Sequence, residues 1–564
     1  MRLLLSARRL LLAVGAAIAA AFLGSVALAS VPRFPDIMPL SRVHAGMTGY
    51  GLTTFHGTTI SRFQVTVLGI LKKENAGHDL ILIRMKGGPI TERGANLIHG
   101  MSGSPIYIDG KLIGAFSMGE EFPKEPLGMV TPIEDMLDSW DPNIPQRPEY
   151  FEPAIRSGAS GRPAKVSSAA HIDLPRPILI GTRRITKVVL DQNTSDGLRS
   201  SEGTAVMRRA SSLMAVSGIN ERDRKWLQAE LNKRGYDIIL AKGPMLAAGG
   251  GTGSRFNGGP LRPGSAFGTF LVTGDVEVGG TGTVTYRRGN RILGFGHPLM
   301  GLGALEGAIT SAYIVDVFPG VQTSHYIAVA GPTIGSLTQD RDFSVSADVG
   351  RLPHLIPFDV TVRDDTSHRT QTFHTSVFQH PDLTPLLMRM IARETISRVH
   401  SAPGDVMARV STTVDAAEVG SINRCNLVFD SGDIATAAGD DLNQITNIVS
   451  GNPFYPLPIR SARMNVEIYA GHDTASLERI YLRKSVFAPG DTVDVGVVLK
   501  PYRREEVTKQ ISITLPSDTP AGRYQLMVRG GMASVLRIGP FVVTGASPDA
   551  DAPPINVRQM VQRL

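Results

Sequence analysis

The sequence predicts a mainly β protein, and three features of its composition support that fold class. Its 564 residues include 60 Gly and 37 Pro, together about 17% against a usual value of about 12%. Charged residues make up 19%, below the typical ~25%, whereas hydrophobic residues reach 42%. The chain can therefore bury hydrophobic cores, and its many turn-forming residues favour short strands over long helices. We expect roughly two to four domains from this length.

The first residues have the pattern of a secretory signal peptide. A short basic stretch, Met1–Arg9, precedes the uncharged run Leu10–Val26, and Ala27-Leu28-Ala29 supplies a small-x-small cleavage pattern. The alternative is an uncleaved membrane anchor, because the run is near the lower limit for a membrane span. We predict a signal peptide over residues 1–29, an exported chain in the periplasm or outside the cell, and no stable membrane span after cleavage.

Charge and cysteine content restrict the partners and cofactors. The formal net charge is 58 − 51 = +7, and no basic run is interleaved with aromatic residues, so nucleic acid is not an expected partner. Cys425 is the only cysteine, which excludes an intramolecular disulfide and a cysteine-based metal cluster. No HExxH motif is present and the histidines show no metal-ligand spacing. We therefore expect no metal and no cofactor.

The N-terminal half is predicted to contain a β lobe followed by a mixed segment. Residues 40–140 form the lobe, with strands at 63–71, 79–85, 106–108 and 111–117. Residues 141–178 are rich in Pro, Ser and Gly and are predicted to be a linker. Residues 179–260 are predicted to be an α/β insertion, with one helix capped by Asn220 and a Gly-rich connector at 249–253. That connector lacks the spacing of a phosphate-binding loop.

The C-terminal half is predicted to contain a second β lobe and a sandwich. Residues 261–400 form this lobe and end in a helix, Thr384–His400, with Pro385 at its first helical position. Residues 401–460 are left unassigned. Short strands separated by turns at 489–491 and 520–522 predict an immunoglobulin- or fibronectin-like β-sandwich over 461–545, before a tail at 546–564. Such a sandwich suits contact with a protein partner in the cell envelope.

A serine between glycines is the most specific chemical feature. Residues 100–105 read GMSGSP, and a strand, an Asp109-Gly110 turn and a second strand follow. A serine nucleophile needs an exposed hydroxyl with backbone N–H groups nearby, and flanking glycines permit the backbone turn that provides them. The hairpin would give this loop a rigid base. The alternative is an ordinary Gly/Ser turn of a β protein.

A serine nucleophile also needs a base, and His297 has the most suitable context. It lies in GFGHP at 294–298, directly after a predicted strand pair. The backbone would present a histidine placed between Gly and Pro at the end of a strand. A structural loop histidine is the alternative reading. His99 is too near Ser102 along one strand, and other histidines in the first lobe lie among loop or strand-end residues, namely His44, His56 and His78.

These segments resemble known serine peptidases. The order GxSGxP, strand, DG turn, strand is similar to the second barrel of the trypsin-like enzymes, which implies a double β-barrel core. The segments GTVTY and GFGHP at 282–298, with GMSGSPIYIDGKLIGA at 100–115, resemble the SpoIVB-type serine peptidases. The resemblance covers roughly 40–138 and 262–365. It implies that Ser102 is the nucleophile, that His297 is the general base, and that Gly100 and Ser102 supply the oxyanion N–H groups.

Two features depart from that family. The serine segment precedes the histidine segment here, the reverse of the sporulation enzyme; a triad is defined by geometry and not by chain order. The family's aspartate before the serine has no counterpart at 84–89. Asp340, in a polar Asp-Arg-Asp turn, is the favoured orienting acid, with Asp275 or Asp79 as alternatives. A Ser–His dyad, or a purely structural Asp–Arg pair at Asp340, is equally open.

The sequence thus supports two functions. The first is an exported serine endopeptidase that cleaves a protein or peptide substrate through an acyl-enzyme. The second is a catalytically inactive peptidase fold that acts as a binding or scaffold protein of the cell envelope.

Overall fold

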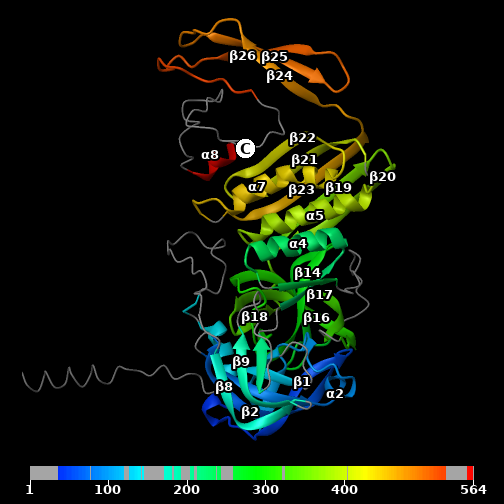
Figure 1. Ribbon diagram of the computed structural model, residues 1–564, viewed down its shortest axis with the longest axis vertical. Coiled ribbons are helices and arrows are strands. Elements are labelled where there is room, and N and C mark those ends of the chain that lie inside the picture. The colour runs from blue at the N-terminus through cyan, green and yellow to red at the C-terminus, as the bar shows by residue number, and fades with distance from the viewer. Residues whose placement is uncertain are drawn as a thin grey trace, which may run out of the picture.

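The computed structural model describes residues 36–562, apart from 76–77, 120–125, 142, 145–169, 181–182, 192–202, 209–211, 237, 243–257, 321–323, 403, 456 and 529–555. The predicted signal peptide and Gly-rich connector lie outside the described residues. The chain builds an elongated molecule, with the N-terminal strands at one end and a small C-terminal sheet at the other (Figure 1). No helix within these ranges has the length and apolar character that a membrane span requires.

The first lobe is a closed antiparallel barrel of six strands. The strand order is β5-β1-β2-β3-β7-β6, and β6 pairs again with β5 to close the barrel. Alternating hydrophobic residues of these strands fill its interior, including Phe63, Ile83 and Ile106. The strands are β1 (Thr48–His56), β2 (Thr59–Asn75), β3 (His78–Lys86), β5 (Pro105–Ile108), β6 (Lys111–Gly119) and β7 (Leu127–Pro132).

Short elements surround the first barrel. The predicted Asp109-Gly110 turn joins β5 to β6, and both residues have positive φ (+50° and +74°), as the tight turn of a hairpin requires. The two-residue strand β4 leaves the first barrel and pairs with β17 of the next one. These short elements are η1 (Leu40–Arg42), α2 (Pro89–Glu92), β4 (Ile98–His99), α3 (Ile133–Leu137) and η2 (Asp138–Trp140).

The second lobe is also a closed antiparallel barrel. Its order is β14-β15-β18-β17-β16-β13, and β13 pairs with β14 to complete the ring. The predicted double β-barrel core is therefore confirmed. The strands are β13 (Ala266–Gly274), β14 (Glu277–Arg288), β15 (Arg291–Gly294), β16 (Gly303–Phe318), β17 (Ser324–Arg341) and β18 (Ser344–Val349).

The segment between the barrels is divided between them and does not form the single insertion predicted for 179–260. Strands β8 (Ala170–Ile180), β9 (Arg183–Asp191) and β10 (Thr204–Arg208) extend the first barrel beside β6. Strands β11 (Ser212–Ser217) and β12 (Ile238–Lys242) extend the second barrel beside β14. Strand β8 also occupies the end of the predicted 141–178 linker.

Helix α4 (Glu221–Lys233) joins β11 to β12 and confirms the helix predicted from its cap. The Asn220 side chain accepts a hydrogen bond from the Asp223 N–H, as an N-cap residue does. Leu227 and Leu231 are buried in the main hydrophobic core, and Trp226 packs against it.

A third unit covers the end of the second barrel and accounts for the unassigned residues 401–460. Its sheet order is β20-β19-β23-β21-β22, and β20 pairs with β13, so this sheet continues the barrel. Helices lie along one face (Figure 1). The elements are β19 (Ile356–Asp364), β20 (Arg369–Val377), α5 (Leu383–Val399), β21 (Val406–Ala416), β22 (Gly420–Asp430), α6 (Ile434–Ala438), α7 (Asp440–Ser450), β23 (Ile459–Ala470) and α8 (Val557–Gln562).

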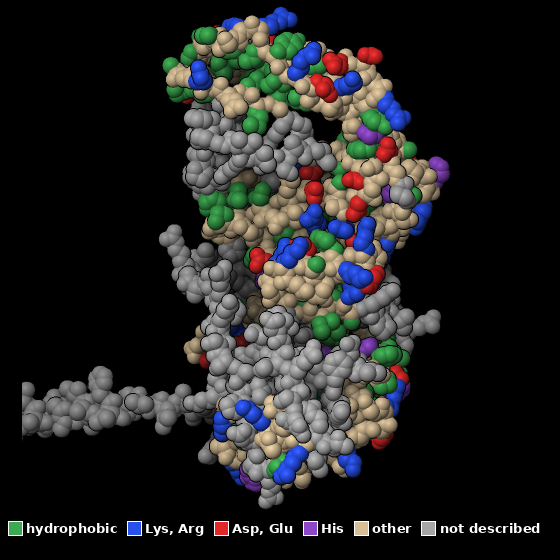
Figure 2. Space-filling view, viewed as in Figure 1, with side chains coloured by type: hydrophobic (Ala, Val, Ile, Leu, Met, Phe, Trp, Pro, Cys, Tyr) green, Lys and Arg blue, Asp and Glu red, His purple; other side chains and the backbone are tan. Residues whose placement is uncertain are grey.

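The predicted sandwich begins too early at residue 461. Strand β23 is parallel to β19 and antiparallel to β21, so it belongs to the central sheet. The C-terminal module instead starts with β24 (Ala475–Leu482), which forms a three-stranded sheet with β25 (Thr492–Pro501) and β26 (Val507–Thr514). Figure 2 shows hydrophobic side chains gathered on this sheet. Residues 529–545 of the predicted sandwich lie outside the described residues, and a complete sandwich stays a prediction.

Candidate active site

Ser102 lies in the turn between β4 and β5, with glycines that take the conformation its sequence predicts. Gly100 has φ +107° and Gly103 has φ +95°, a region that favours glycine. Ser102 is partly exposed, whereas Met101 and Ser104 on either side are buried. The loop therefore turns sharply and presents one hydroxyl while its neighbours are held in the core.

The second barrel holds this loop through three carbonyl groups. The Thr283 N–H donates to the Ser102 carbonyl over 2.8 Å. The Thr283 hydroxyl donates to Gly100 (3.0 Å), and the Thr285 hydroxyl donates to Gly103 (2.7 Å). These contacts come from β14, about 180 residues further along the chain, so the serine loop is completed by the histidine-bearing barrel.

Ser104 fixes the peptide that carries the Ser102 N–H. The carbonyl of Met101 accepts hydrogen bonds from both the Ser104 N–H (2.9 Å) and the Ser104 hydroxyl (2.6 Å). The Met101 carbonyl and the Ser102 N–H belong to one planar peptide and point in opposite directions. The described residues give that N–H no hydrogen-bond partner. The direction of this N–H group is thus fixed by the hydrogen bonds of Ser104.

His297 follows β15 in a short loop and is oriented by its own backbone. Its Nδ1 lies 2.7 Å from the carbonyl oxygen of Pro298. A carbonyl can only accept, so Nδ1 carries the hydrogen, and the lone pair of the neutral ring is on Nε2. This is the tautomer that a general base needs. The side chain is buried, with 3% of its surface exposed, and its ring stands perpendicular to that of Phe295.

The histidine loop is seated on the serine-bearing barrel. The Thr131 hydroxyl of β7 lies 2.7 Å from the carbonyl of Gly296. A side chain at Gly296 would come within 3.1 Å of the Cβ atoms of Ala115 and Ser117. A side chain at Gly103 would come within 2.4 Å of the Phe295 nitrogen. The structure therefore brings the segments of Ser102 and His297 into direct backbone contact.

Asp340 lies beneath the histidine loop. Its buried carboxylate accepts N–H hydrogen bonds from Leu299 (2.6 Å), Met300 (2.8 Å) and Leu302 (3.2 Å). Burial raises the pKa of Asp340, and the main-chain hydrogen bonds offset part of that shift. Its hydrogen bonds thus fix the segment directly after Pro298, the residue whose carbonyl orients His297.

The other acids and histidines considered from the sequence have separate contacts. Asp275 accepts from the His374 N–H, and Asp79 pairs with Lys72. His99 is in β4, where burial and the nearby His325 lower its pKa to about 4. The remaining three histidines of the first lobe contact Ala45, Val315 and Asp135, respectively: His44, His56 and His78.

The described residues hold no group of three or more His, Cys, Asp or Glu side chains that could bind a metal ion. Cys425 is exposed on β22.

Sequence reasoning missed three residues that shape the site: Ser104, Thr283 and Thr285. Ser104 was part of the recognised motif, but its role depends on the turn geometry. The two threonines alternate along β14, which indicates a shared face of a strand. The sequence contains no local signal for which loop that face meets.

Two antiparallel six-stranded barrels that meet at a serine loop and a histidine loop are consistent with the double-barrel fold of the trypsin-like serine peptidases. Residues 33–136 match the family model described as SpoIVB peptidase S55. This range contains the first barrel and Ser102, so this part of the chain is similar to the SpoIVB-type serine peptidases, as the resemblance of its motifs implied. His297 lies outside the match. No curated protein and no solved structure matched the chain.

Proposed function

We propose that the protein is an exported serine endopeptidase in which Ser102 is the nucleophile and His297 is the general base. The observation that carries this proposal is the joining of the two loops across the barrels, with the Thr283 N–H on the Ser102 carbonyl and Phe295 against Gly103. A nucleophile and its base on different barrels need such a contact to keep a fixed separation.

The proposed reaction proceeds through an acyl-enzyme. The lone pair on His297 Nε2 takes the Ser102 proton as the hydroxyl oxygen attacks the scissile carbonyl. The imidazolium then protonates the leaving amine, and the acyl group remains as an ester on Ser102. A water molecule gives its proton to His297 and attacks this ester, which releases the carboxylic acid and restores the serine.

The Ser102 N–H would stabilise the oxyanion, together with the predicted contribution of Gly100. Such donors act most strongly when they are oriented before the reaction begins. The double hydrogen bond of Ser104 to the Met101 carbonyl provides that orientation. Asp340 serves as a positioning residue, because it fixes the loop whose Pro298 carbonyl selects the His297 tautomer.

One observation favours the alternative of an inactive binding or scaffold protein. The His297 side chain is 3% exposed, so little of the imidazole is open to a substrate. The two functions are separated by a fluorophosphonate probe, which forms a covalent bond only with an activated serine. The endopeptidase proposal expects labelling of the wild-type chain, with no label in Ser102→Ala and a loss of about 1,000-fold or more in His297→Ala.

A control is Ser336→Ala, which removes a buried serine hydroxyl in the second barrel. It should keep the wild-type labelling rate. Folded wild-type protein that takes up no label would overturn the endopeptidase and support the scaffold. Export is tested separately by N-terminal sequencing of secreted protein, which should begin at Ser30 if residues 1–29 are cleaved.

A further inference from the structure

A pocket lies in the third unit, formed by elements that carry none of the proposed catalytic residues. It measures about 390 Å³, a volume in the range of small-molecule sites. The first turn of α4, the end of α5, the start of β21 and the loop from β22 to α6 form its walls. Its lining combines charged groups with the apolar side chains of Val406, Ile434 and Ala435. The pocket can therefore contact a hydrocarbon group as well as a polar one.

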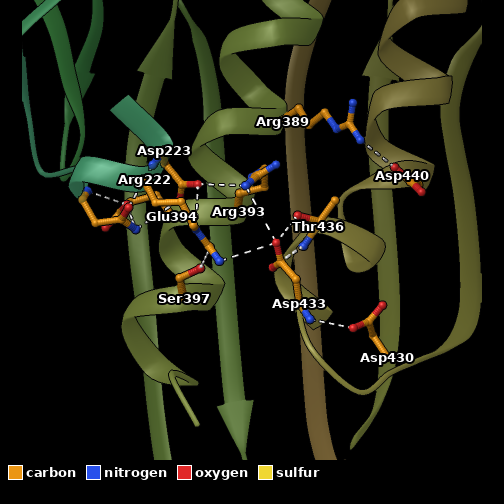
Figure 3. Close-up of polar contacts among 11 residues, drawn as sticks. Arg222, Asp223, Arg389, Arg393, Glu394, Ser397, Asp430, Asp433, Thr436 and Asp440 are labelled. Carbon is orange, nitrogen blue, oxygen red and sulfur yellow. Dashed lines mark hydrogen bonds and ion pairs between the residues drawn. The ribbon is translucent and has the colours of Figure 1, made fainter. Parts of the chain in front are cut away.

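Most of the charges around this pocket are already paired within the chain (Figure 3). Arg222 lies 3.5 Å from the carboxylates of both Asp223 and Asp433, and it donates to the Ser397 hydroxyl over 3.0 Å. Arg393 lies 3.0 Å from Asp223 and 3.9 Å from Asp433. Two arginines thus balance two aspartates, so these four side chains leave no unmatched charge for a ligand.

Asp430 carries the charge that remains. Its Oδ1 accepts from the N–H groups of Gly432 and Asp433, and the described residues give its Oδ2 neither a hydrogen-bond donor nor a cation. Besides His400, the ionisable groups that line the pocket are Arg222, Asp430 and Asp433, with a formal charge of 1 − 2 = −1. The lining therefore has one negative charge in excess.

His400 supplies a second acceptor in the lining, and it is more than nine-tenths buried. Its Nδ1 lies 3.0 Å from Asp364 Oδ2. Burial opposes ionisation of Asp364, but hydrogen bonds from Thr366, Ser367 and His400 outweigh it and lower the pKa to about 2. An ionised carboxylate can only accept, so Nδ1 carries the hydrogen and Nε2 of the neutral ring is an acceptor. The described residues give this Nε2 no donor.

We propose that this pocket binds a small primary alkylamine in its ammonium form. An ammonium has three N–H donors and one positive charge, so it can donate to Asp430 Oδ2 and His400 Nε2 and neutralise the lining. The alkyl group would contact Val406, which lies directly opposite Asp430 in the β21–β22 pair, and Ile434. An anion would face an unpaired carboxylate, and an uncharged ligand would leave the charge of Asp430 unmatched.

The amine would join two elements of the third unit. His400 is the C-cap residue of α5, and Asp430 is the last residue of β22, the outer strand of the central sheet. An occupied pocket would therefore hold the end of α5 against the β22–α6 loop. This inference is independent of the proposed peptidase activity.

The test is isothermal titration of the full-length wild-type protein at pH 8, where a primary alkylamine with a pKa of about 10.4 is charged. The first probe is n-butylammonium. The second, n-butyltrimethylammonium, keeps the charge without an N–H donor, and the third, 1-butanol, keeps the alkyl chain without the charge. We expect saturable one-to-one binding of n-butylammonium with a Kd below about 10 mM, and about tenfold to hundredfold weaker binding of the other two probes.

Variants locate the site. Asp430→Asn keeps the turn, because its amide oxygen still accepts from Gly432, but it should weaken n-butylammonium binding at least about tenfold. His400→Phe keeps a ring but removes the Nε2 acceptor, and should do the same. The control Asp440→Asn changes an exposed carboxylate that pairs with Arg389 outside the pocket, and should bind like the wild-type protein. Urea unfolding identifies the folded variants, and Asp430→Asn decides alone if loss of the His400–Asp364 contact unfolds the other.

Three outcomes would overturn the proposal. They are the absence of saturable n-butylammonium binding up to about 10 mM, equal binding of n-butyltrimethylammonium or 1-butanol, and unchanged binding by folded Asp430→Asn. None of them bears on Ser102 labelling in the wild-type chain, so failure here leaves the peptidase proposal standing.

Discussion

The Ser104 hydroxyl donates to the carbonyl of Met101 over 2.6 Å and thereby fixes the peptide plane that ends in the Ser102 N–H. This contact lies within a single turn, and it fixes the direction of the Ser102 N–H group. It therefore gives the second serine of the GMSGSP segment a structural role in the proposed oxyanion site. In the proposed peptidase, a hydroxyl in that place would contribute through geometry, without contacting the substrate.

The variant Ser104→Ala tests whether this hydroxyl orients the Ser102 N–H group. The Ser104 N–H still holds the Met101 carbonyl, so we expect a loss of only about 1 kcal/mol in the free energy of unfolding. The less rigid oxyanion donor should reduce the maximal rate of fluorophosphonate labelling about tenfold, with little change in probe affinity. Ser336→Ala is the buried-serine control. A wild-type maximal rate in Ser104→Ala would show that this hydroxyl has no part in the site.

Gly100→Ala tests the backbone of the serine loop. A Cβ atom at Gly100 would lie 2.3 Å from the Tyr326 ring, in addition to the cost of φ +107°. Gly46 also has positive φ (+91°) but open space around its Cβ position, so Gly46→Ala measures the conformational cost alone. Urea unfolding should show a loss of about 1–2 kcal/mol for Gly46→Ala and more than about 3 kcal/mol for Gly100→Ala.

Similar losses for the two variants would mean that Tyr326 moves away without cost, contrary to the buried position of its ring and its hydroxyl contact with Thr53.

Asp340→Ala and Asp340→Asn test the positioning of His297. Alanine removes the acceptor for three N–H groups, and asparagine keeps one acceptor oxygen. We expect Asp340→Ala to lower the maximal labelling rate about 100-fold and Asp340→Asn to recover part of it, with probe affinity little changed. Asp275→Asn, which also removes a charge that accepts a main-chain N–H, is the control. Equal rates for the alanine variant and the control would contradict the assignment.

Glu277 predicts a dependence of stability on pH. Burial raises its pKa from 4.5 to about 7, so the folded chain binds more protons than the unfolded chain between these values. The free energy of unfolding therefore falls as pH rises through this window, by about 2 kcal/mol after allowance for partial exposure. Glu277→Gln should remove that fall and be the more stable protein at pH 8.

Chemical unfolding at pH 4 and pH 8 measures both effects, with the exposed Glu505→Gln as control. A wild-type chain that gains stability between these pH values, with the same gain in Glu277→Gln, would show that the carboxyl group is not desolvated in the folded state.

Much of the fold was predictable where the evidence is local. Glycines around Ser102, the Asp109-Gly110 turn and the Asn220 cap each depend on a few neighbouring residues, and all three take the predicted conformation. The double barrel was implied by the resemblance of the order GxSGxP, strand, DG turn, strand to the trypsin-like enzymes. The helix predicted at 384–400 begins one residue earlier, at Leu383, so Pro385 is its third residue and not its first as predicted. The Thr384 hydroxyl accepts from the His380 N–H and donates to the Phe378 carbonyl.

The sequence did not predict strand pairing correctly where the two strands are far apart in the chain. Strand β23 alternates buried and exposed residues as a sandwich strand would, but its neighbours are β19, about 100 residues before it, and β21. Strand β21 has the same alternation, at Val410, Thr412 and Val414, within a region left unassigned. The contacts of Thr283 and Thr285 with the serine loop could not be predicted either. No spacing of residues along the sequence indicates which groups form hydrogen bonds between the two barrels.

The two-residue strand β4 has a consequence for the order in which the protein becomes functional. The first barrel is complete once the chain has passed residue 140, whereas the partner of β4 in β17 begins at Ser324. At about 5–20 residues per second, a ribosome needs on the order of ten to forty seconds to cover that distance. Throughout this interval the nascent chain has Ser102 but lacks β17, the strand that pairs with β4 beside the serine loop. If Ser102 is the nucleophile proposed above, this delay separates its synthesis from its assembly into a complete site.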